Sequence, residues 1–314
     1  MRLPWRRERA EPEPNVAFPP SPEVLRAILR LDLHTRKFVE SLFTGEYSSV
    51  FHGRGFEFSH VRAYQPGDDV RSIDWRVTAR RGIPYVRQFV EERDLFVVLL
   101  VDISASGRLG PGQKSAADVA TEIAAALAFS AVRRNDRVAM LLVTDRVEQT
   151  VRPGSGQRHV VRMLSTLLSF RPRGRGTNLA VGLDAIGRSF SGRAAVFVLS
   201  DFIDVGPEAS FRQVMGRVAR RHDVTAVRLL GRSTDELPDA GWVEMTDPET
   251  GRRIVLNTGN RRVRERYRRG VQRAHAAMAS LLTEAGAELL DIDTATDPLL
   301  ALTDFFRRRQ RSPR

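Results

Sequence analysis

The stretch Asp102-Ile103-Ser104-Ala105-Ser106 directly follows the apolar run Leu95 to Val101. That run has no helical period and no alternation of polar and apolar residues, which predicts a strand buried on both faces of a sheet. The Asp-x-Ser-x-Ser motif then lies at the carboxyl end of a central strand, where open α/β sheets bind their ligands. One carboxylate and two hydroxyls are hard oxygen donors, so the motif suits Mg²⁺ or Mn²⁺.

Two further oxygen donors lie near the ends of other predicted helices and strands. Thr177 lies in the Gly-rich segment 173–179, and Asp201 directly follows the apolar run Ala194 to Ser200. This order of motifs resembles the metal-ion-dependent adhesion site of von Willebrand factor A (vWA) domains, where such residues hold one divalent ion, some of them through water. The resemblance implies a metal site made of Asp102, Ser104, Ser106, Thr177 and Asp201.

A simpler interpretation of the same residues involves no metal. Asp102 and Ser104 can satisfy backbone groups in a turn, and Asp201 can cap a helix. The occurrence of all three motif parts in this order, each after a predicted strand or before a predicted helix, favours the metal site.

The segment from Gly53 to Arg93 contains a second motif, Gly67-Asp68-Asp69-Val70-Arg71-Ser72-Ile73-Asp74-Trp75, followed by Ala79-Arg80. Together with the later Asp-x-Ser-x-Ser, this motif resembles the DUF58 family over nearly everything from the first helix to the end of the chain. The resemblance implies a vWA-like domain with an extra segment beside it, and it implies no enzymatic activity.

The three aspartates of this second motif have two interpretations. They can form a second ion or partner site, or they can pair with neighbouring arginines in a network that holds an irregular loop, with Trp75 as its apolar anchor. The mixture of charges of both signs favours internal pairing.

Strand and helix patterns alternate along the rest of the chain. This alternation predicts an α/β fold with a vWA-like, Rossmann-like, mostly parallel sheet covered by helices on both faces, plus a small β-rich accessory segment. We expect a disordered tail at 1–20, a helix and the DUF58 signature segment at 21–93, the vWA-like domain at 94–306 with a hairpin insertion near 240–257, and a basic tail at 307–314.

Composition restricts the possible functions. The chain of 314 residues has no cysteine, which excludes disulfides, zinc ribbons and thiol catalysis and fits a reducing compartment. No apolar run is long enough to span a bilayer and no signal peptide opens the sequence, so we expect a cytoplasmic protein. The net charge of +12 favours an acidic partner, nucleic acid or an anionic surface.

These observations favour a non-enzymatic, metal-dependent protein-interaction module. In the vWA resemblance an acidic residue of a partner completes the coordination of the ion, and Arg171, Arg173 and Arg175 beside Thr177 would attract such a partner. Proteins resembling DUF58 often act as adaptors or chaperones with AAA+ ATPases of the MoxR type, and the resemblance therefore implies such a partner here.

Two other function classes are weaker. Asp102 after a buried strand resembles the nucleophile of Mg²⁺-dependent haloacid-dehalogenase-like phosphotransferases, but Ser104 stands where those enzymes need a second aspartate as acid and base. The positive charge favours nucleic-acid binding, yet the sequence shows no known binding module and no aromatic stacking platform. We therefore expect nucleic acid not to be the partner.

Overall fold

The computed structural model describes residues 20–44, 56–65, 68–69, 73–91, 96–108, 114–203, 205–231 and 236–311. The chain divides into two compact units, one formed by His52–Asp94 and the other by Met1–Phe51 together with Leu95–Arg314. The predicted disordered tail at 1–20 lies, except for its last residue, outside the described residues.

The larger unit is built on a six-stranded sheet with the order β10-β7-β6-β3-β4-β5. All neighbouring strands are parallel except β5, which runs antiparallel to β4 at the edge. The mostly parallel sheet expected from the sequence is confirmed. The order reverses at β3, so the carboxyl ends of β3 and β6 flank the position where doubly wound sheets bind ligands. The strands are β3 (Phe96–Asp102), β4 (Arg137–Val143), β5 (Val147–Gly154), β6 (Ala194–Ser200), β7 (Asp223–Leu230) and β10 (Glu288–Asp293).

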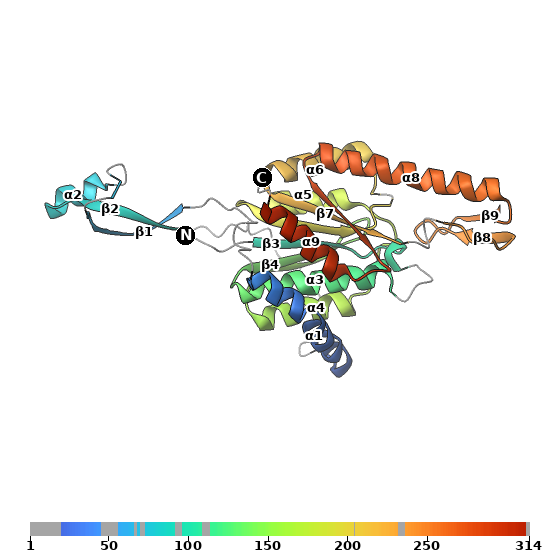
Figure 1. Cartoon of the computed structure of the whole chain (residues 1–314), viewed down its shortest axis with the longest axis horizontal. Helices are drawn as coiled ribbons and strands as arrows, with labels where there is room; N and C mark the ends of the chain where they lie inside the picture. Colours follow the sequence, from blue (N-terminus) through green and yellow to red (C-terminus); the bar gives the residue numbers. More distant parts are fainter. Residues whose placement is uncertain are drawn as a thin grey trace. The chain divides into compact units, whose positions relative to one another are not determined.

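Helices cover both faces of this sheet, as Figure 1 shows. One face packs against α1 (Pro22–Thr44), α3 (Ala116–Arg133), α4 (Gln157–Ser169) and α9 (Pro298–Arg311). The other face packs against α5 (Leu179–Ser189), α6 (Glu208–Arg221) and α8 (Arg261–Glu284). Among the described residues, no helix has the length and the apolar character needed to cross a membrane.

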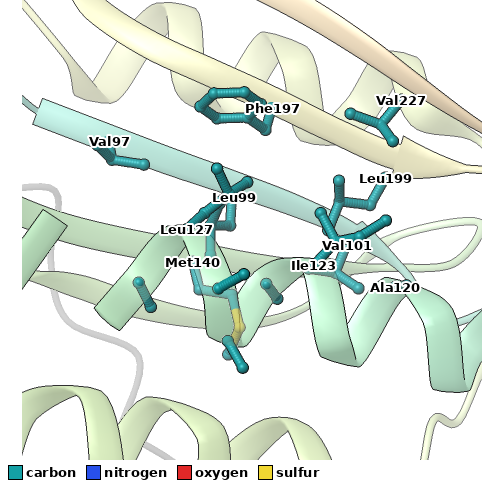
Figure 2. Packing of buried hydrophobic residues seen from close by; sticks show 14 of the residues in the cluster. Val97, Leu99, Val101, Ala120, Ile123, Leu127, Met140, Phe197, Leu199 and Val227 are labelled. Carbon is teal, nitrogen blue, oxygen red and sulfur yellow. The ribbon is translucent and has the colours of Figure 1, made fainter. Parts of the chain in front are cut away.

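The two faces of β3 explain why it is central. Val97, Leu99 and Val101 pack against α3, next to side chains of β6 (Figure 2). Val98 and Leu100 point into the opposite cluster, which contains α5 and α6. Burying a side chain of this size stabilises the fold by roughly 1.5–3 kcal/mol. The absence of polar alternation in the sequence of β3 therefore reflects a strand that has no solvent face.

The basic tail predicted at 307–314 is wrong for its first part, because α9 continues to Arg311. Arg309 is only 8% exposed and forms ion pairs with Asp223 of β7 and with Glu288 of β10, the latter at 3.5 Å. These two carboxylates compensate the buried guanidinium and hold the last turn of the helix against the sheet edge. Residues 312–314 lie outside the described residues.

The smaller unit contains an antiparallel pair, β1 (Phe56–Ala63) and β2 (Tyr85–Glu91), and the short helix α2 (Trp75–Arg81). Asp74 caps α2, because its carboxylate accepts hydrogen bonds from the backbone N–H groups of Arg76 and Val77. Trp75 is 66% exposed, so the expectation that it anchors an ion-pair network is wrong.

The hairpin expected near 240–257 is present in the larger unit. β8 (Trp242–Thr246) pairs antiparallel with β9 (Arg253–Asn257), and Asp247 to Arg252 form the turn between them. Both strands are short and largely exposed. The turn, rather than the strands, contributes to the site described below.

His222 should make the stability of the larger unit depend on pH. Its imidazole is 2% exposed, and neither ring nitrogen has a hydrogen-bond partner within the described part of the chain. Burial, together with the charges of Arg221 and Arg193, lowers the pKa of His222 to about 4. A proton therefore binds more tightly to His222 in the unfolded chain than in the folded one. As the pH falls below the ordinary histidine pKa of 6.5, protonation favours the unfolded chain and the free energy of unfolding decreases. Between pH 7 and pH 5 we expect a loss of about 2 kcal/mol from this group.

Urea unfolding at both pH values measures this effect. His222→Leu should unfold with a smaller pH dependence than the natural protein. His34→Leu, which removes an exposed histidine of α1, is the matched control and should behave like the natural protein. An unchanged pH dependence in His222→Leu would contradict the prediction.

Candidate metal centre

Asp102 ends the buried strand β3 and is itself only 9% exposed. Its Oδ1 accepts a hydrogen bond from the backbone N–H of Ser104 at 2.9 Å, and its Oδ2 accepts one from the hydroxyl of Ser200 at 2.6 Å. Burial raises the pKa of Asp102, while these hydrogen bonds act in the opposite direction. The carboxylate is therefore fixed in place at a considerable cost in solvation.

The two serines of the motif lie side by side. The Oγ atoms of Ser104 and Ser106 are 3.1 Å apart, and Ser106 begins the 3₁₀ turn Ser106–Arg108. The loop leaves the sheet late, because Ile103 N–H still donates to Val143 C=O at 2.9 Å. This bond extends the pairing with β4 by one residue beyond Asp102, and the two serines follow directly after it.

The loop that carries Thr177 is attached to the Asp102 loop and to the end of β4. Ala105 N–H donates to Arg175 C=O at 3.1 Å, and Asn178 N–H donates to Thr144 C=O at 2.9 Å. The carboxylate of Glu148 accepts hydrogen bonds from the N–H groups of Arg173 and Gly174 at 3.1 and 2.6 Å. Thr177, which is 7% exposed, is thus held at a defined position next to the motif.

Asp201 follows β6, the neighbour of β3. Its Oδ1 accepts a hydrogen bond from Ile203 N–H at 2.9 Å. Burial first, and then the charge of Asp102, raise the pKa of Asp201 to about 6, whereas the Ser106 hydroxyl favours the ionised form. β3 and β6 are parallel neighbours, so Asp102 and Asp201 lie at the same edge of the sheet, at the ends of adjacent strands.

The backbone next to Asp201 is strained. Phe202 has a φ of +56°, a conformation that bulky residues rarely adopt. Two contacts hold it there: its N–H donates to Ser200 Oγ at 2.9 Å, and its ring lies 6.5 Å from that of Phe211. Such strain is common at functional sites, where the surrounding structure enforces it.

The alternative without a metal receives mixed support. Asp102 does accept a backbone hydrogen bond within a turn, as that alternative requires. Asp201 does not cap a helix, since α6 begins at Glu208 after Pro207. Within the described residues, moreover, no lysine or arginine pairs with Asp102 or Asp201.

The donor set fits a small divalent cation. A buried carboxylate, Asp102, and a half-buried one, Asp201, lie next to hydroxyls and lack a basic counter-charge, and such oxygen donors are those that Mg²⁺ and Mn²⁺ prefer. No group of three or more acidic or histidine side chains in the described part of the chain is arranged to hold a metal ion. Any ion here would therefore depend on the hydroxyls of Ser104, Ser106 and Thr177 as well as on the two aspartates.

Two residues at the site escaped the sequence analysis. Ser200 binds Asp102 across the strand ends, and its position directly before Asp201 is the signal that indicates it. Glu249, in the turn of the β8–β9 hairpin, accepts hydrogen bonds from both the N–H and the hydroxyl of Thr177, at 3.0 and 2.7 Å. No local pattern indicates Glu249, since 72 residues separate it from Thr177.

Comparisons with known proteins agree with the sequence motifs. The model of the family described as "Protein of unknown function DUF58" matches residues 60–277. An uncharacterized protein of Mycobacterium tuberculosis is 32% identical over 310 residues, which span 95% of this chain and 96% of that protein.

Solved structures are also similar in part. The conserved hypothetical protein BatB from Bacteroides thetaiotaomicron is 17% identical and aligns with a TM-score of 0.45 over 69% of this chain and 100% of its own. A von Willebrand factor type A structure from Catenulispora acidiphila is 13% identical, with a TM-score of 0.39 over 72% of this chain and 43% of its own.

Gly174 should be essential for the position of the Thr177 loop. A Cβ at this position would overlap the side chains of Thr144 and Asp145, whereas a Cβ at Gly176 would meet its nearest atom at an ordinary 3.7 Å. We expect Gly174→Ala to destabilise the fold by about 1–3 kcal/mol, as overpacking does. Urea unfolding measures this change, and Gly176→Ala is the matched control on the same loop. Equal stability of the two variants would contradict the assigned packing.

Proposed function

The chain belongs to the DUF58 family, and we propose that it is a non-enzymatic interaction module that binds its partner through one divalent ion. The observation that carries this proposal is the pair of carboxylates at the ends of adjacent strands, the buried Asp102 and the half-buried Asp201, which have no basic counter-charge in the described residues. Keeping two such groups together is costly, and a cation between them would remove the cost.

In this proposal the ion is Mg²⁺ or Mn²⁺. Its ligands are Asp102, Ser104, Ser106, Thr177 and Asp201, directly or through water. An ion held by two carboxylates and neutral hydroxyls is close to electroneutral, so it can accept one more anion. The acidic side chain of a partner protein has the required charge and chemistry.

The charges around the site support an acidic partner. Arg171, Arg173 and Arg175 are exposed on the loop that leads to Thr177. Positive side chains at the rim of a binding site increase the rate at which negatively charged partners associate. The family resemblance adds a more specific hypothesis, a MoxR-type AAA+ ATPase as the partner.

The non-enzymatic part of the proposal has its own support. The matching family is described as one of unknown function, and the related mycobacterial protein is called uncharacterized, so neither name indicates a reaction. Ser104, at the position where a phosphotransferase of the haloacid-dehalogenase type needs an acid, lies against another hydroxyl. A serine hydroxyl does not act as acid and base near neutral pH.

Asp102→Asn should greatly weaken binding of the ion. Calorimetric titration of the natural protein with Mn²⁺ should show one site per chain, and the variant should bind at least about a hundredfold more weakly, because loss of a direct ligand exceeds the usual cost of an outer-shell change. Asp145→Asn is the matched control, since Asp145 also follows a sheet strand but pairs with Arg146. Equal Mn²⁺ affinity of Asp102→Asn and the natural protein would contradict the site.

The partner can be captured from a lysate of the source cell. With the natural protein as bait, we expect an acidic protein, an AAA+ ATPase under the more specific hypothesis, to bind in Mg²⁺ and to be lost in EDTA. Asp102→Asn should capture none of it in either buffer. Capture that is equal in both buffers would show that binding does not use an ion. Recovery of mainly nucleic acid that salt removes would favour the basic surface instead.

A further inference from the structure

Glu249 is bound to Thr177 more extensively than a surface carboxylate needs to be. Each of its oxygens accepts a separate hydrogen bond, one from the Thr177 N–H and one from its hydroxyl. Its Oε2 also lies beside Gly176, the preceding residue of the same loop. Glu249 is half-buried, although Asp247 and Thr250 on either side of it in the turn are exposed.

The turn that carries Glu249 is rigid for reasons of its own. Asp247 Oδ1 accepts a hydrogen bond from Glu249 N–H at 2.9 Å, and Asp247 C=O accepts one from Gly251 N–H at 2.8 Å. Gly251 has a φ of +71°, which a residue with a side chain rarely adopts. Because Asp247 binds its own turn, the carboxylate of Glu249 is the one directed at the Thr177 loop.

The hydrogen bond from the Thr177 hydroxyl has a consequence for metal binding. A hydroxyl has one proton to donate and two lone pairs that can accept. When the proton is donated to Glu249, the lone pairs are left for a cation on another side of the oxygen. Carboxylates that orient a ligand in this way commonly determine the affinity of a metal site, although they do not touch the ion.

We propose that Glu249 is a positioning residue of the metal centre and that it couples the β8–β9 hairpin to the ion. This inference rests on the proposed function, because it assumes that Thr177 is a ligand. It extends the site to a segment that none of the sequence motifs includes. By linkage, an ion that binds better when Thr177 is oriented by Glu249 must in turn strengthen the attachment of the hairpin.

Glu249→Gln tests the proposal with little change in shape. A glutamine side chain has one oxygen and one NH₂ group where Glu249 has two oxygens, so the Thr177 N–H and hydroxyl can no longer donate to separate oxygens. A hydroxyl that faces the NH₂ group must accept its hydrogen bond, and this uses a lone pair that the ion would need. Glu244→Gln is the matched control, since Glu244 lies on β8 of the same hairpin and contacts Arg253 at 3.3 Å. Mn²⁺ alone is the probe, and the full chain is used for every variant.

Three readouts separate positioning from a general structural effect. Calorimetry with Mn²⁺ should show affinity lowered at least about tenfold in Glu249→Gln and unchanged in Glu244→Gln. Thermal unfolding in EDTA should give similar midpoints for both variants and the natural protein. Amide hydrogen exchange of residues 242–257 should slow when Mn²⁺ is added to the natural protein and to Glu244→Gln, but not to Glu249→Gln.

The possible failures are distinguishable. If the natural protein binds Mn²⁺, Asp102→Asn does not, and Glu249→Gln binds as the natural protein does, only the role of Glu249 is overturned. If Glu249→Gln also unfolds at a clearly lower temperature in EDTA, its role is structural and the inference is again overturned. If the natural protein binds no Mn²⁺, the metal centre itself is wrong and the inference falls with it.

Discussion

Burial of β3 on both faces is the constraint on which the rest of the structure depends. Its side chains alternate between two hydrophobic clusters, so the strand needs a helical layer on each side and a parallel neighbour at each edge. A strand so enclosed cannot shift by one residue without exchanging the side chains of its two faces. The position of Asp102, the last residue of β3, is therefore determined by the packing of the whole sheet.

The same packing places the carboxylate of Asp102 at a position with little access to water. Asp102 ends β3 and Asp201 follows the adjacent parallel strand β6, so their carboxylates lie at the same edge of the sheet, and the charge of Asp102 contributes to the raised pKa of Asp201. Hydrogen bonds from Ser104 and Ser200 offset part of this cost for Asp102. The strained backbone at Phe202 is a further local cost. The raised pKa values and the strained backbone both occur at the carboxyl ends of β3 and β6, where the strand order reverses. Such a combination is more typical of a ligand site than of a structural turn.

Contacts between distant segments give the site its rigidity. Glu148 on β5 holds the start of the Thr177 loop, and Glu249 in the hairpin turn holds Thr177 itself. Each carboxylate accepts main-chain hydrogen bonds, so each fixes backbone and not only side chains. The hairpin, which the sequence predicts only as an insertion, is thereby part of the surroundings of the proposed ion.

The sequence by itself determined the sheet and its central strand, because buried strands leave local patterns of hydrophobicity. The five residues of the metal site come from short motifs and their spacing, and they stay a prediction. The sequence also indicated the hairpin through its Asp-Pro-Glu-Thr-Gly turn. Only the tertiary structure decided that Arg309 belongs to a helix and is buried, and is not part of an exposed basic tail. It likewise decided that Trp75 is exposed and that Glu249 accepts a hydrogen bond from Thr177. Each of these depends on a partner, or on the lack of a covering neighbour, far away in the chain. Local periodicity carries no information about such pairings, since charge and size alone do not specify which distant group a side chain will meet.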